Sequence, residues 1–283
     1  MPAMSAPARR LEYRWGLTLA RVIVMTIQVA PVPAFKDNYL WVIHDGRYAA
    51  VVDPGDAAPV IDYLTQHSLE LTAILITHHH ADHIGGVDAL LKKYPVPVFG
   101  PAGEDIPQLT TRHFEGDQIT VPKLNLTFDV LDIPGHTAGH IAYLGRGDAA
   151  AKLFCGDTLF AGGCGRVFEG TMPQMRASLD KLKKLPGDTQ FYCAHEYTLS
   201  NLAFALAVEP DNADLTARIA DAKATRAANR PTVPSTIALE QKTNPFLRWD
   251  APAVIASAKT RANQSAMTAD EVFTQVREWK NSF

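Results

Sequence analysis

The chain has 283 residues, of which 47% are hydrophobic and 20% charged, values typical of a globular protein that buries a core. Its formal net charge of -3 argues against a protein that binds nucleic acid or an anionic membrane through its overall electric field. The cysteines, Cys155, Cys164 and Cys193, form no closely spaced metal-type pair and no disulfide framework, so we expect a reducing compartment, the cytoplasm.

Residues 1–24 differ in character from the rest of the chain. They include several arginines but only one acidic residue, Glu12. Their apolar run, Leu17–Val24, is interrupted by Arg21 and is too short to span a bilayer. A transit peptide is one interpretation. We favour a dispensable extension, with the folded domain beginning at Met25.

From residue 25 to residue 196, short β-rich segments alternate with a few helical ones. Strands are expected at Thr26–Ala30, Tyr39–Ile43, Tyr48–Val52, Leu71–Ile76, Val96–Phe99, Leu126–Ile133, Ile141–Leu144, Ala151–Phe154 and Gln190–Cys193. Helices are expected at Ala57–Gln66, His83–Lys93 and Pro173–Leu185. Strands interleaved with helices indicate sheets covered by helices, which is the α/β class.

Residues 197–283 have a different composition, rich in alanine and helical in their periodicity. Helices are expected at Leu199–Val208, Ala213–Ala228, Ala251–Ala262 and Ala269–Trp279. We therefore expect an α/β domain over residues 25–196 and an appended helical domain over residues 197–283.

The segment after the expected strand Leu71–Ile76 is the most informative in the chain. It holds His78, His79, His80, Asp82 and His83, four imidazoles and a carboxylate within six residues. Imidazole and carboxylate are ligands of zinc, iron and manganese. Side chains two apart, at the end of a strand, can point the same way, so this segment predicts a metal site.

Three other expected strands also end at candidate ligands. Leu126–Ile133 runs into a segment containing His136, Ala151–Phe154 is followed by Asp157, and Gln190–Cys193 is followed by His195. Each of these residues alone is weak evidence, because a single histidine after a strand is usually an ordinary surface residue. Together with the histidine-rich segment, they predict a site that holds two metal ions.

The segment His78–His83 matches the HxHxDH motif and resembles the metallo-β-lactamase superfamily. The resemblance implies an αββα sandwich of two mixed sheets with helices outside. It also implies ligand roles, with Asp157 shared by both ions. The first ion would be held by His78, His80 and His136, and the second by Asp82, His83 and His195. His79 would not be a ligand, and His140 would support the site from outside it, as a structural residue like His44, His67 and His113.

Further segments, which extend into the helical region, resemble the glyoxalase II family within that superfamily. They are Gly156–Phe160, Gly163–Arg166, Phe168–Thr171, His195–Thr198, Pro231–Thr236, Asn244–Arg248 and Arg277–Lys280. The resemblance runs from about Met25 to Phe283 and implies that the C-terminal helices bind glutathione. By resemblance, the residues that contact the glutathionyl group are Arg166, Tyr197, Arg277 and Lys280. Two departures are Arg166, where the family often has lysine, and Phe168, where it often has tyrosine.

The implied reaction is hydrolysis of S-lactoylglutathione to glutathione and D-lactate, the second step of methylglyoxal detoxification. Asp82 and Asp157 would be the catalytic carboxylates, acting with a metal-activated hydroxide. We expect two divalent ions, zinc first, with iron or manganese possible, and a monomeric protein whose partner is a small glutathione thioester. The chain has no G-x-S-x-G segment, and its cysteines lack an evident histidine–carboxylate arrangement, which disfavours covalent catalysis.

Other functions remain open at this level. One is a mononuclear iron persulfide dioxygenase of the same superfamily, using His78, His136 and Asp157 as its triad. Others are a lactonase, a β-lactamase, or a non-catalytic binding protein that kept the fold. The expected second ligand set and the basic C-terminal segment favour the thioester hydrolase.

The extension can be tested by removal. A chain that begins at Met25 should match the full chain in melting temperature and activity, because residues 1–24 are expected to add nothing to the core. A thermal melt and a hydrolysis assay on both proteins check this. A large loss in either measurement would instead show that Leu17–Val24 packs against the folded domain.

Overall fold

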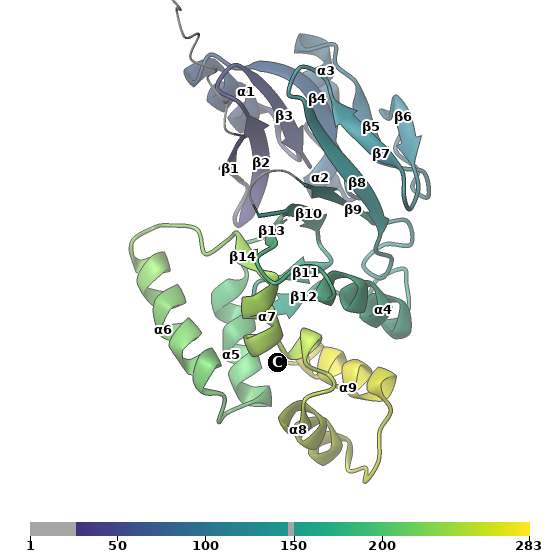
Figure 1. Cartoon of the computed structure of the whole chain (residues 1–283), viewed down its shortest axis with the longest axis vertical. Helices are drawn as coiled ribbons and strands as arrows, with labels where there is room; N and C mark the ends of the chain where they lie inside the picture. Colours follow the sequence, from purple (N-terminus) through teal and green to yellow (C-terminus); the bar gives the residue numbers. More distant parts are fainter. Residues whose placement is uncertain (1–26, 147–149) are drawn as a thin grey trace, which may run out of the picture.

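The computed structural model describes residues 27–146 and 150–283. Two six-stranded sheets stack face to face, with helices on their outer sides and further helices at the C-terminal end of the chain (Figure 1). This confirms the expected αββα sandwich with a C-terminal helical region. The expected extension, residues 1–24, and the start of the strand placed at Thr26 lie outside the described residues.

The first sheet is buried on both faces. Its strands, in spatial order, are β1 (Gln28–Ala34), β2 (Asn38–His44), β3 (Tyr48–Val52), β4 (Glu70–Leu75), β5 (Val98–Pro101) and β6 (Thr111–His113). Successive side chains of a strand point to opposite faces. In β2, Leu40 and Val42 accordingly pack with helices α1 (Ala57–Gln66) and α3 (Val87–Lys93), whereas Trp41 packs in the core shared with the second sheet.

The second sheet completes the sandwich. Its order is β14 (Ser235–Thr236), β13 (Gln190–Cys193), β10 (Lys152–Gly156), β9 (Ile141–Gly145), β8 (Leu126–Asp132) and β7 (Gln118–Val121). A two-stranded hairpin, β11 (Leu159–Phe160) with β12 (Gly163–Cys164), follows β10. Helix α4 (Met172–Lys183) packs Met175, Leu179 and Leu182 into the same core as this sheet.

Hydrogen bonds between the sheets fix how they stack. The buried Tyr143 of β9 donates its hydroxyl to the carbonyl of Ile76, just after β4, at 2.7 Å. Trp41 of β2 donates its indole N–H to the carbonyl of Cys193 in β13 at 2.9 Å. Both donors are almost fully buried, so these bonds set the register of one sheet on the other.

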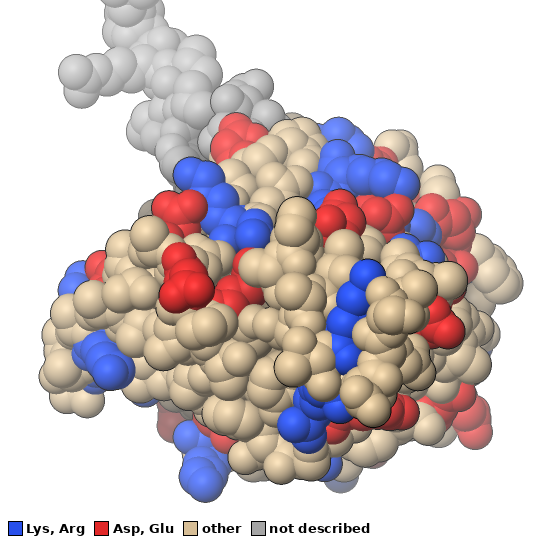
Figure 2. Space-filling model, turned by 90° about the horizontal axis from the view of Figure 1, so that it is seen from below, with Lys and Arg blue, Asp and Glu red and all other residues tan. Residues whose placement is uncertain are grey.

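The C-terminal region is helical, as expected, and contains charged groups that are buried and paired. Its elements are α5 (Thr198–Val208), α6 (Ala213–Ala227), α7 (Ile237–Thr243), the 3-10 helix η1 (Pro245–Leu247), α8 (Pro252–Ala262) and α9 (Ala269–Asn281). Glu240 pairs with Arg218, and Glu209 pairs with Arg248. Within the described part of the chain, no helix is long and apolar enough to cross a membrane. Lysine and arginine side chains lie among acidic ones on the face seen in Figure 2.

The expected single helix His83–Lys93 is wrong. The structure has two helices, α2 (Ala81–Ile84) and α3, separated by Gly85 and Gly86. The N–H of Gly86 donates to the carbonyl of Pro54, and a Cβ at this position would lie 2.5 Å from the same oxygen. The glycine therefore lets the turn after β3 pack directly against the histidine-rich segment. Periodicity alone also missed the short elements β6, β7, β11, β12, β14 and α7.

The Tyr143 hydroxyl gives a test of the sandwich. Tyr143→Phe removes only the oxygen and takes this donor away from the buried carbonyl of Ile76, so the free energy of unfolding should fall by about 1–3 kcal/mol. Urea unfolding measures this. The control is Tyr192→Phe, because Tyr192 donates to the side chain of Gln190 in its own strand and should cost less. Equal losses in the two variants would contradict a special role for the bond between the sheets.

Candidate metal centre

Strand direction brings the candidate ligands to one edge of the sandwich. Strand β10 is parallel to β13 and antiparallel to β9, which is in turn antiparallel to β8. The carboxyl ends of β8, β10 and β13 therefore lie at the same edge of the second sheet, and they are followed by His136, Asp157 and His195. The histidine-rich segment follows β4 and meets this edge, where Thr77 accepts a backbone hydrogen bond from Ile141.

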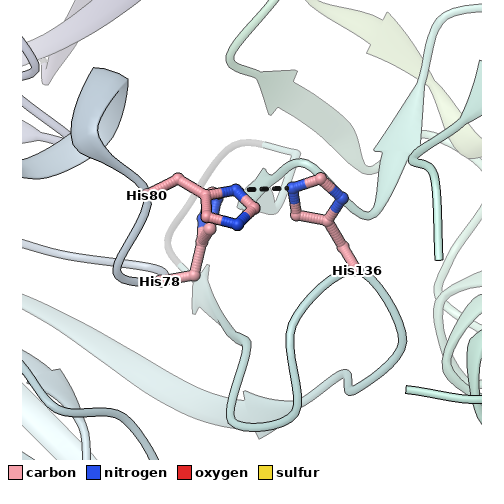
Figure 3. Close-up of side chains that lie close together, drawn as sticks. All are labelled: His78, His80 and His136. Carbon is pink, nitrogen blue, oxygen red and sulfur yellow. Dashed lines mark hydrogen bonds between the residues drawn. The ribbon is translucent and has the colours of Figure 1, made fainter. Parts of the chain in front are cut away.

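The first cluster consists of His78, His80 and His136, whose rings converge (Figure 3). Nε2 of His78 lies 3.2 Å from Nδ1 of His80, and Nε2 of His136 lies 3.0 Å from the same atom. Burial lowers the pKa of all three imidazoles below the usual value. They are therefore neutral at physiological pH, and the neutral imidazole is the form that binds a metal ion.

The second cluster consists of Asp82, His83 and His195. Oδ2 of Asp82 lies 3.4 Å from Nε2 of His195 and 3.7 Å from Nε2 of His83. Asp157 lies between the two clusters. Its Oδ2 is 3.4 Å from Nε2 of His136 and 3.3 Å from Nε2 of His195, and its Oδ1 is 3.5 Å from Nε2 of His83. The sequence-predicted ligands thus come together as two groups that share one carboxylate.

The electrostatics of the second cluster favour a bound cation. Burial by itself lowers the pKa of His195, but the charge of Asp157 and hydrogen bonds to carboxylates outweigh it and raise the pKa to about 10. Burial by itself raises the pKa of Asp157, but His83 and His195 outweigh it and hold the pKa well below its usual range. Nε2 of His83 and Oδ1 of Asp157 are buried and have no hydrogen-bond partner among the residues that the structure describes. A divalent cation between these atoms would satisfy both, so the residues fit a metal ion.

Each buried histidine of the site is also held on the nitrogen that faces away from the cluster. His78 contacts the hydroxyl of Thr77 at 3.1 Å, and His136 contacts the carbonyl of Arg166 at 2.8 Å. Nδ1 of His195 contacts Asp37 at 2.9 Å. Nδ1 of His83 faces the carboxylate of Asp53 at 3.1 Å but does not have hydrogen-bond geometry with it. Such outer partners fix the tautomer and orientation of a metal-binding imidazole.

Sequence reasoning missed these two aspartates. Asp53 directly follows β3, so its place at a strand end was an available signal, whereas Asp37 lies in the turn before β2 and carried none. Asp53 also groups with His78 and His83 as a possible cation site. Its two oxygens, however, already accept hydrogen bonds from the N–H and the hydroxyl of Thr77, both at 2.7 Å.

His79 and His140 have other partners. His79 contacts the carboxylates of the buried Glu104 and of Glu169, and it joins His80 and Glu169 in a grouping at the more exposed side of the site. His140 is fully buried and stacks on His78 with a ring separation of 4.5 Å. Its Nε2 accepts a hydrogen bond from the N–H of Asp157 at 3.2 Å. His140 therefore braces two of the candidate ligands.

The expected glutathione contacts lie in differing environments. Arg166 is exposed, and Tyr197 stacks on His195 at 4.7 Å with its edge in solvent. Arg277 is not on a solvated helix face: it is 3% exposed, and its Nη1 donates to the carbonyl of Cys164 at 2.8 Å. Lys280 is partly buried, and its pKa is lowered by this burial and by the charges of Arg277 and Arg166. The three cations therefore lie near one another.

The ring of Phe168 stands beside the first cluster. It is 61% exposed, and its centroid lies 5.3 Å from the ring of His136. An aromatic side chain that exposed offers an apolar wall next to the candidate ligands. The three cysteines, in contrast, are buried and unpaired.

Comparison with known proteins agrees with this geometry. The family model described as "Metallo-beta-lactamase superfamily" matches residues 35–195, and the model described as "Hydroxyacylglutathione hydrolase C-terminus" matches residues 196–283. A hydroxyacylglutathione hydrolase of Cupriavidus taiwanensis is 57% identical over 265 residues, which cover 91% of this chain and 99% of that protein.

Solved structures share the fold. The crystal structure of ETHE1 from Myxococcus xanthus has a TM-score of 0.62 and 24% identity, covering 90% of this chain and 91% of its own. The crystal structure of TTHA1623 in a di-iron-bound form has a TM-score of 0.55 and 25% identity, covering 77% of this chain and 100% of its own. With both family models matched and a near-complete relative at 57% identity, the chain belongs to the hydroxyacylglutathione hydrolase family of the metallo-β-lactamase superfamily.

Proposed function

We propose that this protein is a thioester hydrolase with a binuclear metal centre, which cleaves S-(2-hydroxyacyl)glutathione. Its main substrate would be S-lactoylglutathione. The products are glutathione and a 2-hydroxy acid, D-lactate in that case. The observation that carries the proposal is the pair of ligand clusters sharing Asp157. The relatives named hydroxyacylglutathione hydrolase supply the substrate class.

The ligand assignment follows the two clusters. His78, His80 and His136 would hold one ion, Asp82, His83 and His195 the other, and Asp157 both. Imidazole and carboxylate ligands suit zinc, which we propose, and they also accept iron or manganese. The related structure of TTHA1623 is described in a di-iron-bound form, which supports a two-metal site of this general type.

When bound, two divalent cations would lower the pKa of a bound water enough to give hydroxide near neutral pH, and they would offset the negative charge on the attacked carbonyl oxygen. Asp82 is the least buried carboxylate of the second cluster, with 40% of its side chain exposed, and Asn38 donates to its Oδ2 at 3.1 Å. Water can reach this group, so we assign Asp82 to orienting the nucleophile by accepting its hydrogen bond. The departing group is a thiolate, whose low basicity removes the need for a strong general acid.

Substrate recognition is assigned to the four residues that the resemblance implies. Arg166, Lys280 and the more deeply placed Arg277 would attract the carboxylates of glutathione, and Tyr197 would line the site next to His195. We accordingly propose residues 25–196 as the catalytic domain and residues 197–283 as the glutathione-binding domain. A monomer in the cytoplasm remains our proposal for assembly and location.

The second candidate function is a mononuclear iron persulfide dioxygenase that uses His78, His136 and Asp157. The likeness to ETHE1 at 24% identity shows the fold alone. Asp82, His83 and His195 form a complete second cluster, which a mononuclear enzyme does not need. Oxygen uptake with glutathione persulfide, without hydrolysis of S-lactoylglutathione, would favour this alternative.

Removing the shared carboxylate tests the metal assignment. Asp157→Asn keeps the size of the side chain but removes the charge that both clusters face. Metal content measured by mass spectrometry should fall, and kcat should drop by at least about 100-fold, since even outer partners of ligands are worth 10- to 100-fold. His44→Ala is the control, because His44 is buried away from the site and should leave the metal content unchanged. Two bound metals and normal turnover in Asp157→Asn would refute the assignment.

Lys280 tests the substrate class. Lys280→Gln should raise KM for S-lactoylglutathione by roughly 10-fold while kcat changes little, because a cation that binds glutathione far from the thioester contributes uniform binding. Steady-state kinetics measure both parameters. A thioester without the glutathione carboxylates is the control substrate, and its KM should be the same for the wild-type protein and for Lys280→Gln. An unchanged KM would leave Lys280 as a structural residue.

A further inference from the structure

The hairpin formed by β11 and β12 is held mainly by side chains from the helical region. The carbonyls of Phe160 and Gly163 both accept hydrogen bonds from Nδ2 of Asn244, at 3.2 and 2.9 Å. The carbonyl of Ala161 accepts from Asn201 at 3.2 Å. The backbone groups of Phe160, Ala161 and Gly163 therefore all bind side chains that are distant in sequence, and Gly162 does so as well.

Glu240 supplies the remaining contact and ties the set together. Its Oε2 accepts from the N–H of Gly162 at 2.8 Å and from Nδ2 of Asn244 at 3.0 Å. Its Oε1 pairs with Arg218 and accepts the hydroxyl of Ser235. Glu240 is fully buried, so its charge depends on these partners. A single buried carboxylate thus connects the hairpin to helices α6 and α7.

The residues after this anchored stretch contact the functional groups of the site. The carbonyl of Cys164 accepts from Nη1 of Arg277, and the carbonyl of Arg166 contacts Nδ1 of His136. The hairpin is therefore the segment that lies between the candidate glutathione cation and the first metal cluster. Its position decides where the guanidinium of Arg277 can stand.

The segment Asn244–Phe246 influences Arg277 in two ways, through the hairpin and by direct contact. Asn244 holds the hairpin whose Cys164 carbonyl receives Nη1, while the ring of Phe246 lies 4.9 Å from the centre of the guanidinium. The Nε atom of Arg277 is buried and has no hydrogen-bond partner among the described residues. The guanidinium of Arg277 is thus fixed by the Cys164 carbonyl, Asn281 and the Phe246 ring, and a fixed guanidinium suits recognition of a carboxylate.

We propose that Asn244, Asn201 and Glu240 are positioning residues for glutathione recognition. They fix the hairpin so that the Cys164 carbonyl and the Phe246 ring hold Arg277 in the orientation that receives a glutathione carboxylate. The inference rests on the proposed function. It also explains a motif, Asn244-Pro245-Phe246, that contains no ligand or cationic group of its own.

The test compares binding with turnover in the full-length protein. Asn244→Ala should raise the Kd of S-methylglutathione, measured by calorimetry on both the metal-loaded and the metal-depleted protein, and the KM of S-lactoylglutathione, each by roughly 10-fold. The kcat should change much less. The reason is that Gly165, next to the Arg166 carbonyl that contacts His136, is held separately: its N–H donates to the carbonyl of Thr158 at 3.1 Å, without Asn244. Asn201→Ala, which loses one hydrogen bond to Ala161, is a milder second variant should Asn244→Ala not fold.

The matched control is Glu209→Gln. Glu209 is 3% exposed and accepts from Arg248 at 2.7 and 2.9 Å, so its loss removes a buried ion pair of the same helical region without touching the hairpin. It should lower the melting temperature while leaving Kd and KM unchanged. The inference is overturned if Asn244→Ala and Asn201→Ala lose stability like the control but keep wild-type Kd and KM. If the wild-type protein itself binds no S-methylglutathione and does not hydrolyse S-lactoylglutathione, the proposed function fails instead.

Discussion

Asp157 is a buried carboxylate at the meeting point of two sheets, and a buried carboxylate needs a positive partner. Its oxygens face His83 of helix α2, His136 and His195, which follow three different strands along the chain. Protonated imidazoles supply only part of this positive charge, because Oδ1 of Asp157 and Nε2 of His83 form no hydrogen bond within residues 27–146 and 150–283. Divalent cations between these atoms would supply the rest of the positive charge. The surrounding residues are therefore best understood as a support that positions metal ions.

This support is built outward from Asp157. Asp53 binds Thr77 and faces His83, so the turn after β3 and the histidine-rich segment are held together. The buried Glu104 accepts hydrogen bonds from the backbone of His79 and Gly139, and so joins the loops that carry the first cluster. Asp53 and Glu104 thus already have protein partners, whereas Asp82 and Asp157 are the carboxylates that we propose as metal ligands. A pre-organised shell of this kind holds ligand geometry when the ions leave and return.

The helical region completes the site in a second way. Asn244 and Glu240 form hydrogen bonds with the hairpin after β10, and Arg277 of α9 donates to the carbonyl of Cys164. A catalytic edge made only by the sandwich would offer the ligands and Arg166, but it would lack Arg277 and Lys280, the other cations proposed to bind the two carboxylates of glutathione. Arg277 is buried, whereas Lys280 is only partly buried, so the two proposed glutathione cations would contribute differently, Arg277 as a fixed donor and Lys280 as a more accessible charge.

Much of this was readable in the sequence. The candidate ligands were expected because histidines and aspartates directly follow apolar strands. The strand Tyr48–Val52 and the helix Ala57–Gln66 match the structure because their patterns are strictly local. The helix across Gly85-Gly86 was predicted wrongly, since its break is imposed by close contact with Pro54. The burial of Arg277, the roles of Asp37 and Asp53, and the grip of Asn244 on Phe160 and Gly163 depend on residues brought together from distant parts of the chain. Local periodicity and residue type determine which side chains stand at strand ends, whereas only the packing of sheets and helices decides which carbonyl or carboxylate each of them meets.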